Sequence, residues 1–437
     1  MRIVAIGIGG GGNRIVDDFV SCNPATIQAA IAVDASQSTL KDLDHVPNKR
    51  RALVGTSRVY GNGAGCDNDL GAELVAADID LVQECLDTTP VYEADAVVVV
   101  AGLGGGTGSG GAPVLAQHLN RLYELPVYGV GILPGSFEND PRTLNAARSL
   151  QTFVRKADNL LLFDNDVWIA PDKKYESQYD SANKELIKRM VAIFDGSAEH
   201  REDSKFSLTN QDVIDTLSSG GISTIGYASE TVELPSNGLI SRVFGGNDDD
   251  STDDADATNR ITSLVRKAAL ETLTLECNVE CVHTLLACSG PPEHLSDKGV
   301  IRGLKWLEQA NDGNVFSDSS EPKTNGTVFS GSFSVPGREV VTCATLFSGL
   351  QGVPRIKEIQ QVAIEAQEAA TQSNSETDQA STPEHESTDT QIFDPAERAE
   401  TQTSFRSESE STDTRVFSSD HSDETDIFEP DQAEHDK

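Results

Sequence analysis

The sequence predicts an α/β fold: a parallel sheet covered by helices on both faces, then a long central helix, a smaller α+β domain and a disordered acidic tail. Three observations lead to this prediction. Short apolar runs alternate with helical segments in the first half of the chain. Two glycine-rich turns each follow one of those runs directly, and apolar periodicity ends near residue 365.

The strands of the predicted sheet are short and almost wholly apolar. Runs of this kind are typical of parallel strands that are buried on both faces. Helical segments lie between them, at residues 13–21 and at about 113–123. The apolar runs occupy residues 3–6, 31–33, 96–101, 127–132 and 160–163.

The first glycine-rich turn, Gly7–Asn13, follows the first apolar run. It contains the spacing GxGxxG between a strand and a helix, and Asp34 ends the next strand about 20 residues later. Spacing and context together match the dinucleotide fingerprint. Taken alone, the turn favours an NAD-binding oxidoreductase, which stays an alternative at this point.

The second glycine-rich turn, residues 102–111, follows a strand with four consecutive valines. Glycines let backbone N–H groups approach phosphates, and the next helix, which we expect to carry Pro113 in its first turn, adds a favourable dipole. Thr107 and Ser109 offer hydroxyl donors. Two such turns on one sheet suit one triphosphate held from two sides. The GxxxxGK[ST] motif of P-loop NTPases is absent from the sequence.

The second half of the chain predicts different architecture. A helical pattern over residues 181–196 has an apolar face, and we assign 181–204 to a central helix. The acidic insert 248–256 is predicted to be a surface loop. Residues 225–365 are predicted to form the α+β domain, with a helix at about 258–273 and strands near 282–288 and 340–348.

The tail, residues 366–437, is rich in Ser, Thr, Gln and acidic residues and is predicted to be disordered. A short motif with a phenylalanine between acidic residues recurs in it. The copies centre on Phe393, Phe417 and Phe428. Repetition favours a multivalent docking motif for a protein adaptor at the cell envelope, and chance reuse of low-complexity sequence is the alternative.

The net charge of the chain limits the solvent conditions and the binding partners that suit the protein. The chain has 70 acidic and 34 basic residues, a net charge of −36, and both body and tail are acidic. Such a surface excludes nucleic-acid binding by counterion release and favours a salt-rich cytoplasm, where charges are screened. No signal peptide or membrane span is apparent in the sequence, so we expect a cytoplasmic protein.

The segment GGGTGSG at residues 104–110 resembles the signature of the tubulin/FtsZ superfamily. The resemblance implies a Rossmann-like GTPase domain over residues 1–180, GTP or GDP with Mg²⁺ as cofactors, and head-to-tail polymerisation with itself. It also implies which residues bind the nucleotide. These are Gly10, Gly11, Gly12, Asn13, Arg14, Gly105, Gly106, Thr107, Gly108, Glu138, Arg142, Asn165, Tyr179 and Asn183.

The resemblance assigns a role to each polar residue of that set. Glu138 is placed at the ribose and Arg142 beside the phosphates. Asn165 and Asn183 are placed at the guanine edge, and Tyr179 stacks on the base. The first glycine turn resembles that of FtsZ.

Segments of the second domain are similar to CetZ, the tubulin-like branch of haloarchaea. They are residues 289–296, 305–308 and 353–358, and residues 143–149 of the first domain agree. This similarity implies a cytoskeletal GTPase that controls cell shape in a halophilic archaeon, with filaments near the cell envelope. A GTP-binding filament scaffold with little or no hydrolysis is the alternative.

Residues 205–224 resemble the family's catalytic loop and the helix after it, which act on the nucleotide of the neighbouring subunit. In a gapless register Asp212 is the catalytic acid, and Thr209 stands at a preceding acidic position, so hydrolysis is expected to be slow. A shifted register, Asn210-x-Asp212-x-x-Asp215, also matches the FtsZ pattern but needs a gap. Both registers include Asp212.

Overall fold

The computed structural model describes residues 1–22, 24–169, 175–195, 208–233, 250–277, 280–311, 327–335 and 337–366. The predicted tail, with its three phenylalanine motifs, lies outside these residues except for its first position.

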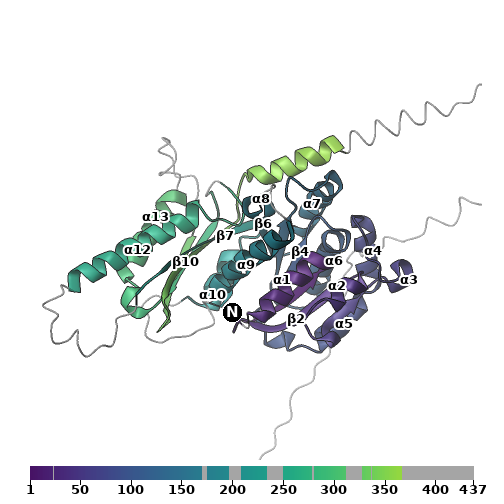
Figure 1. Cartoon of the computed structure of the whole chain (residues 1–437), viewed down its shortest axis with the longest axis horizontal. Coiled ribbons are helices and arrows are strands. Elements are labelled where there is room, and N and C mark those ends of the chain that lie inside the picture. The colour runs from purple at the N-terminus through teal and green to yellow at the C-terminus, as the bar shows by residue number, and fades with distance from the viewer. Residues whose placement is uncertain are drawn as a thin grey trace, which may run out of the picture. The chain divides into compact units, whose positions relative to one another are not determined.

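The described strands form one ten-stranded sheet in the order β3-β2-β1-β4-β5-β6-β7-β10-β8-β9 (Figure 1). The strands from β3 to β7 run parallel, and β10 is antiparallel to both of its neighbours. Their bounds are β1 Ile3–Ile8, β2 Ile27–Asp34, β3 Arg51–Leu53, β4 Ala96–Gly102, β5 Val127–Leu133, β6 Asn159–Asp164, β7 Ile222–Thr231, β8 His283–Gly290, β9 Thr327–Ser334 and β10 Val340–Ser348.

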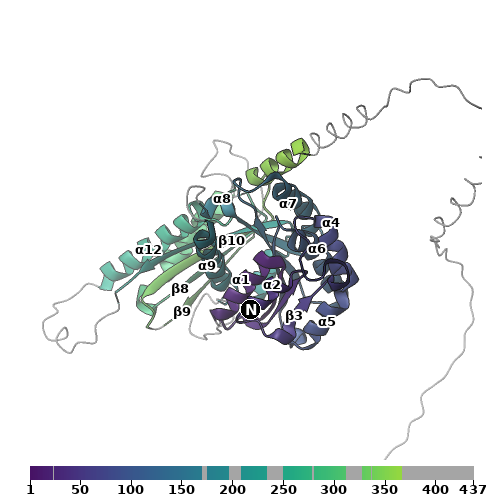
Figure 2. The same ribbon diagram turned by 45° about the vertical axis from the view of Figure 1, so that its right-hand side comes forward.

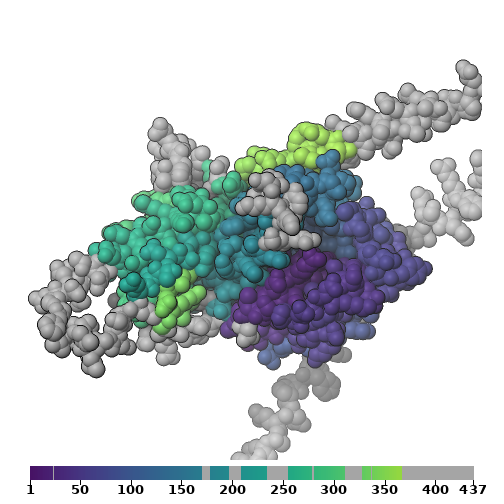
Figure 3. All heavy atoms as spheres, viewed as in Figure 1, coloured from purple at the N-terminus to yellow at the C-terminus, as the bar shows by residue number. Residues whose placement is uncertain are grey.

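Helices cover both faces of the sheet, as Figures 1 and 2 show. The main ones are α1 Gly9–Ser21, α4 Asn68–Ala77, α5 Ile79–Asp87, α6 Gly106–Leu122, α7 Asp140–Phe153, α9 Tyr175–Phe194, α12 Asp250–Leu270 and α13 Asp297–Asn311. Shorter ones are α2 Gln37–Lys41, α3 Thr56–Val59, α8 Asn165–Trp168 and α10 Asn210–Leu217. A last helix, residues 354–366, lies on the surface over the blue residues of α7 (Figure 3).

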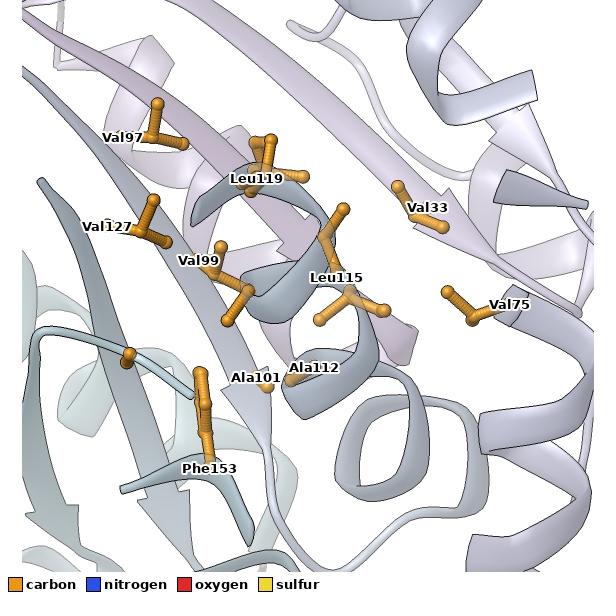
Figure 4. Packing of buried hydrophobic residues seen from close by; sticks show 14 of the residues in the cluster. Val33, Val75, Val97, Val99, Ala101, Ala112, Leu115, Leu119, Val127 and Phe153 are labelled. Atoms are coloured by element: carbon orange, nitrogen blue, oxygen red, sulfur yellow. The ribbon is translucent and has the colours of Figure 1, made fainter. Parts of the chain in front are cut away.

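Each face of the parallel sheet has its own hydrophobic core. Side chains alternate along a strand, so Val4, Ile6 and Ile8 of β1 face the core under α6, whereas Ile3 and Ala5 face the core under α1 and α9. Figure 4 shows the first of these cores, with α6 packed over β4. Burial on both faces explains why the strands are continuous apolar runs.

The strands expected from apolar runs are all present. Three strands were not expected: β3, β7 and β9. β3 has three residues, and β7 and β9 interleave polar and small residues with apolar ones, so none of them stands out as an apolar run.

The prediction of a surface loop at residues 248–256 is wrong from Asp250 onward, because α12 begins there. Acidic residues in a first turn are favourable beside the positive end of the helix dipole. Asp254 also forms an ion pair of 2.6 Å with Lys298 of α13 and accepts a hydrogen bond from Ser296. These contacts of Asp254 join α12 to the start of α13.

The expected position of Pro113 is also wrong. Helix α6 begins at Gly106, inside the glycine-rich turn, so Pro113 lies well past the first turn. A proline there leaves the carbonyl four residues earlier without its helical donor. The Ser149 hydroxyl of α7 supplies a replacement by donating to Ser109 O at 2.7 Å.

Two boundaries expected from the sequence fall inside continuous elements. The division at residue 180 lies within α9, and the division at 225 lies within β7, which pairs with both β6 and β10. The described part of the central helix ends at Phe194, short of the expected residue 204. None of the helices that the structure describes is long and apolar enough to cross a membrane.

Candidate functional site

A cavity of about 680 Å³ opens at the carboxyl ends of the parallel strands. Its floor lies where β1 and β4 are neighbours, and the chain leaves these two strands into α1 and α6. The sheet order reverses at this point, because β2 and β3 lie to one side of β1 and β5 and β6 lie beyond β4. Open α/β sheets bind their ligands in the crevice at such a reversal.

Both glycine-rich turns are the first turns of helices, and the two turns touch. Gly9 has a φ of 71°, and a Cβ there would lie 2.8 Å from the backbone nitrogen of Gly108. A Cβ on Gly108 would in turn lie 2.6 Å from Gly102 O. The first N–H groups of a helix have no acceptor within the helix, so a cavity lined by the starts of two helices suits a phosphate group.

Most of the residues assigned to the nucleotide from the sequence lie together on this lining. From the helix starts these are Gly10, Gly11, Arg14, Gly105, Gly106, Thr107 and Gly108. From the other side they are Glu138, Arg142, Asn165, Tyr179 and Asn183.

Gly12 and Asn13 do not line the cavity, which corrects their placement. A Cβ on Gly12 would lie 2.1 Å from Val100 O, so this glycine permits α1 to pack closely against β4. Asn13 is fully buried, and its amide exchanges hydrogen bonds with the backbone of Val33: Nδ2 donates to Val33 O at 3.0 Å, and Oδ1 accepts from Val33 N at 3.2 Å. Both residues therefore stabilise the turn through contacts with the sheet.

The far end of the cavity is polar and pre-organised. Glu138 accepts hydrogen bonds from Gly135 N at 3.0 Å and from the Tyr179 hydroxyl at 3.2 Å, and it pairs with Arg142 at 3.3 Å. Three elements thus supply this end: the segment after β5, the start of α8 with Asn165, and α9 with Tyr179 and Asn183.

Asp34 ends β2 and lies on the lining, with 2% of its surface exposed. Its carboxylate accepts hydrogen bonds from Thr39 Oγ1 at 2.8 Å and from Ser36 N at 3.2 Å. Burial raises the pKa of this carboxyl, and the hydrogen bonds from Thr39, Ser36, Ala35 and Thr107 oppose that rise. In a dinucleotide fold the corresponding acid accepts from the ribose, but Asp34 is engaged by its own loop.

The lining also includes residues that were not assigned to the nucleotide. The segment 62–65 resembles the family's third loop, and its glycines were a usable signal. Phe137, directly before Glu138, also lies on the lining, and no feature of the sequence indicated it. The further unassigned residues are Gly9, Ile15, Asp34, Ser36, Thr39, Gly102, Gly104, Ile132, Pro134 and Asn139.

The predicted catalytic acid, Asp212, is not part of the cavity. It occupies the first turn of α10, where Asp212 Oδ2 accepts from Thr209 N at 2.8 Å and from Thr209 Oγ1 at 2.7 Å. Thr209 caps the helix and accepts in return from Asp212 N, which completes a capping box. The threonine at the family's acidic position therefore has a structural role.

Helix α10 lies at the opposite end of the sheet from the cavity. Asn210 Nδ2 donates to Asp95 Oδ2 at 2.9 Å, and Asp95 directly precedes β4, whose far end leads into the second glycine-rich turn. A strand of seven residues spans about 23 Å. Asp212 therefore lies far from the nucleotide cavity of its own chain.

Comparisons with known proteins agree over most of the chain. A family model described as the Tubulin/FtsZ family GTPase domain matches residues 2–171, and one described as the tubulin-like CetZ C-terminal domain matches residues 172–365. The tubulin-like protein CetZ1 of Haloferax volcanii is 49% identical over 380 residues, covering 84% of this chain and 93% of CetZ1.

Solved structures give the same result. The GDP-bound monomer of CetZ1 from Haloferax volcanii has a TM-score of 0.72 at 46% identity, covering 84% of this chain and 100% of that one. The GTPγS-bound protofilament of CetZ2 from the same organism has a TM-score of 0.72 at 31% identity, covering 85% and 100%. Since the two family models meet at residue 172 and the CetZ1 match spans most of both proteins, this chain belongs to the CetZ group of the tubulin/FtsZ family.

Proposed function

We propose that this protein binds GTP and GDP in the cavity, polymerises head to tail, and hydrolyses GTP where one subunit meets the next. One observation carries the proposal: the nucleotide cavity and Asp212 lie at opposite ends of the same sheet. A subunit stacked on another in the same orientation brings Asp212 of the first to the cavity of the second.

The cavity suits a guanine nucleotide. The starts of α1 and α6 would hold the phosphates, with Arg14 and Arg142 adding positive charge on the lining. Glu138 would accept from the ribose hydroxyls, while Asn165 and Asn183 can pair with the donor and acceptor edge of guanine. Two relatives of known structure were solved with GDP and with GTPγS.

Hydrolysis requires an in-line water and little covalent chemistry from the protein. The capping box uses Oδ2 of Asp212, and Oδ1 has no partner among the described residues. This oxygen of the incoming subunit would accept a hydrogen bond from the water and orient it toward the γ-phosphorus. The water oxygen would form a bond to the γ-phosphorus as the bond from that phosphorus to the bridging oxygen breaks, leaving GDP and an inorganic phosphate that takes up a proton of the water, the other proton being released. Because Thr209 supplies no second acid, we expect slow turnover.

Mg²⁺ fits the cavity as part of the nucleotide complex. The described residues contain no cluster of three His, Cys, Asp or Glu side chains that could hold an ion alone. Mg²⁺ commonly binds through one or two carboxylates together with substrate phosphates. The ion would neutralise phosphate charge, and the lining offers it the carboxylates of Asp34 and Glu138.

The cellular role that follows is a filament near the cell envelope that controls cell shape. Its acidic tail would connect the filament to a protein adaptor, since an anionic membrane would repel it. A filament scaffold with little hydrolysis is the second candidate, and Thr209 in place of an acid favours it.

GTP turnover measured against protein concentration in molar KCl tests the proposal. A shared site predicts that turnover rises faster than linearly, in step with light scattering from assembly. Turnover strictly proportional to concentration without assembly contradicts the shared site. Assembly with GTP but without turnover selects the scaffold.

A further inference from the structure

Arg355, outside the nucleotide cavity, forms a dense set of polar contacts. It lies at the start of the helix of residues 354–366, and 14% of its side chain is exposed. Its guanidinium pairs with Asp166 at 2.7 Å, with Glu358 at 3.2 Å and with Asp164 at 3.3 Å. Nη2 also donates to Pro134 O at 3.0 Å.

The partners of Arg355 hold two segments of the cavity wall. Asp164 caps α8 by accepting from Asp166 N at 3.2 Å. Asp166 in turn accepts from Ser136 N at 2.7 Å and from Ser136 Oγ at 3.1 Å. The guanidinium therefore joins the start of α8 to the segment after β5.

These two segments carry the residues that we assign to the nucleoside. Asn165 directly follows Asp164, and Glu138 lies two residues after Ser136. Arg355 itself does not line the cavity. Any effect of Arg355 on a nucleotide must therefore pass through the position of Asn165 and Glu138.

We propose that Arg355 is a positioning residue for the nucleoside end of the site, and that it links the helix leading to the tail with guanine recognition. The inference rests on the proposed function. The pairing with Asp164 and Asp166 is largely sheltered from solvent, so molar salt screens it less than it screens surface charges.

The helix of residues 354–366 has apolar anchors besides Arg355. Val353 and Ile359 are buried in the core beneath the sheet, and Ile356 packs against it. These apolar contacts hold the helix without the guanidinium. In Figures 1 and 2 the helix lies beside α7, and the contact of Arg355 with Asp166 places its start against α8.

The test compares Arg355→Met with Arg260→Met by calorimetric titration of the full chain with GDP and with ADP in molar KCl. Arg260 of α12 is the matched control, because it is a largely buried arginine that pairs with Glu230 of β7 at 2.9 Å. We expect Arg355→Met to weaken GDP binding at least tenfold and ADP binding less, because ADP shares the ribose that Glu138 would bind but lacks the guanine edge that Asn165 would pair with. Arg260→Met should leave the affinities for GDP and ADP unchanged. Arg355→Lys should restore only part of the lost GDP affinity, because an ammonium keeps the positive charge but cannot make the planar paired contacts of a guanidinium.

If the role of Arg355 is purely structural, Arg355→Met should lower thermal stability, as Arg260→Met does, and leave the preference for GDP over ADP unchanged. That result overturns the inference. If Arg355→Met does not fold, Asp166→Asn tests the inference in its place. This variant removes the negative charge that connects Arg355 to Ser136, so it should also reduce the preference for GDP over ADP. A wild type that fails to bind GDP refutes the proposed function instead.

Discussion

We expect two amide side chains to determine which base the site prefers. Asn165 and Asn183 reach the lining from α8 and α9. We expect GDP to bind at least tenfold more tightly than ADP in calorimetric titrations at high salt.

Removing one hydrogen-bonded partner costs about 1–3 kcal/mol, so Asn165→Ala should weaken GDP binding about 5- to 150-fold. Asn120→Ala, which loses a surface hydrogen bond to Lys156 O, is the control. Equal affinity of the wild type for GDP and ADP would refute the guanine assignment.

A second residue, Asp164, is expected to make the stability of the fold depend on pH. Burial raises the pKa of its carboxyl from 3.8 to about 6, although Arg355 opposes the rise. A carboxyl with a raised folded pKa contributes stability below its unfolded pKa and loses it as pH rises through the folded value. Between pH 4 and pH 7 this group should therefore lower the free energy of unfolding by roughly 1–3 kcal/mol.

Chemical denaturation of wild type and Asp164→Asn at pH 4, 5, 6 and 7 measures this contribution. The asparagine can still cap α8, so the difference between the two proteins isolates the charge. We expect the stability of the wild type relative to the variant to fall as pH rises. A constant difference would mean that Asp164 titrates as an exposed aspartate does.

Single residues were predictable from sequence where spacing fixes geometry. The two glycine turns placed Gly10 and Thr107 on the lining, because a turn between a buried strand and a helix leaves little freedom. Gly12 and Asn13 belong to the same turn, but they face the sheet. That direction depends on the phase of α1, which begins at Gly9, and composition does not reveal where a glycine-rich helix begins.

At the scale of elements, the position of α10 makes a prediction about hydrolysis. Asp212→Ala should preserve nucleotide binding, stop turnover and leave filaments long-lived, because under the proposed function this acid acts on the nucleotide of the neighbouring subunit. The variant loses the hydrogen bonds that Asp212 accepts from Thr209 but keeps Thr209 as the helix cap, so we expect a cost of about 0.5–1.5 kcal/mol, which a shift in melting temperature would report. Phosphate release and sedimentation measure turnover and filament lifetime.

Asp215→Ala is the matched variant on the same helix. The Asp215 side chain accepts from Gln211 at 2.6 Å and is the further acid of the shifted register. Under the gapless register this variant should keep turnover close to wild type. Loss of turnover in Asp215→Ala alone would select the shifted register over the gapless one.

Elements were predictable where burial is symmetric. The central strands β1 and β4 to β6 are buried on both faces, so their sequences are apolar runs. β7 continues the sheet with the sequence ISTIGYASET, in which hydroxyls such as Ser223 and Thr224 are buried through hydrogen bonds to Asn159 and Thr274. Those partners are distant in sequence, so no local pattern marks the strand.

For the whole molecule, charge determines the conditions of every measurement. Subunits with a net charge of −36 repel one another, and salt screens this repulsion because the Debye length falls to about 3 Å at molar salt. Assembly of identical acidic subunits should therefore require high salt. This dependence on salt follows from composition alone, whereas the location of Asp212 opposite the cavity required the fold.

The tail gives the last prediction. Residues 370–437 have too little apolar content to form a core, so removing them should leave folding and GTP binding unchanged. The motifs around Phe393, Phe417 and Phe428 would each bind an adaptor weakly, and display along a filament would convert weak sites into strong avidity. Changing all three phenylalanines to serine should delocalise the protein in cells, as fluorescence microscopy would show, while turnover and filaments persist in vitro. Single substitutions should have smaller effects, because two copies remain. Normal localisation of the triple variant would mean that the repeats have no docking role.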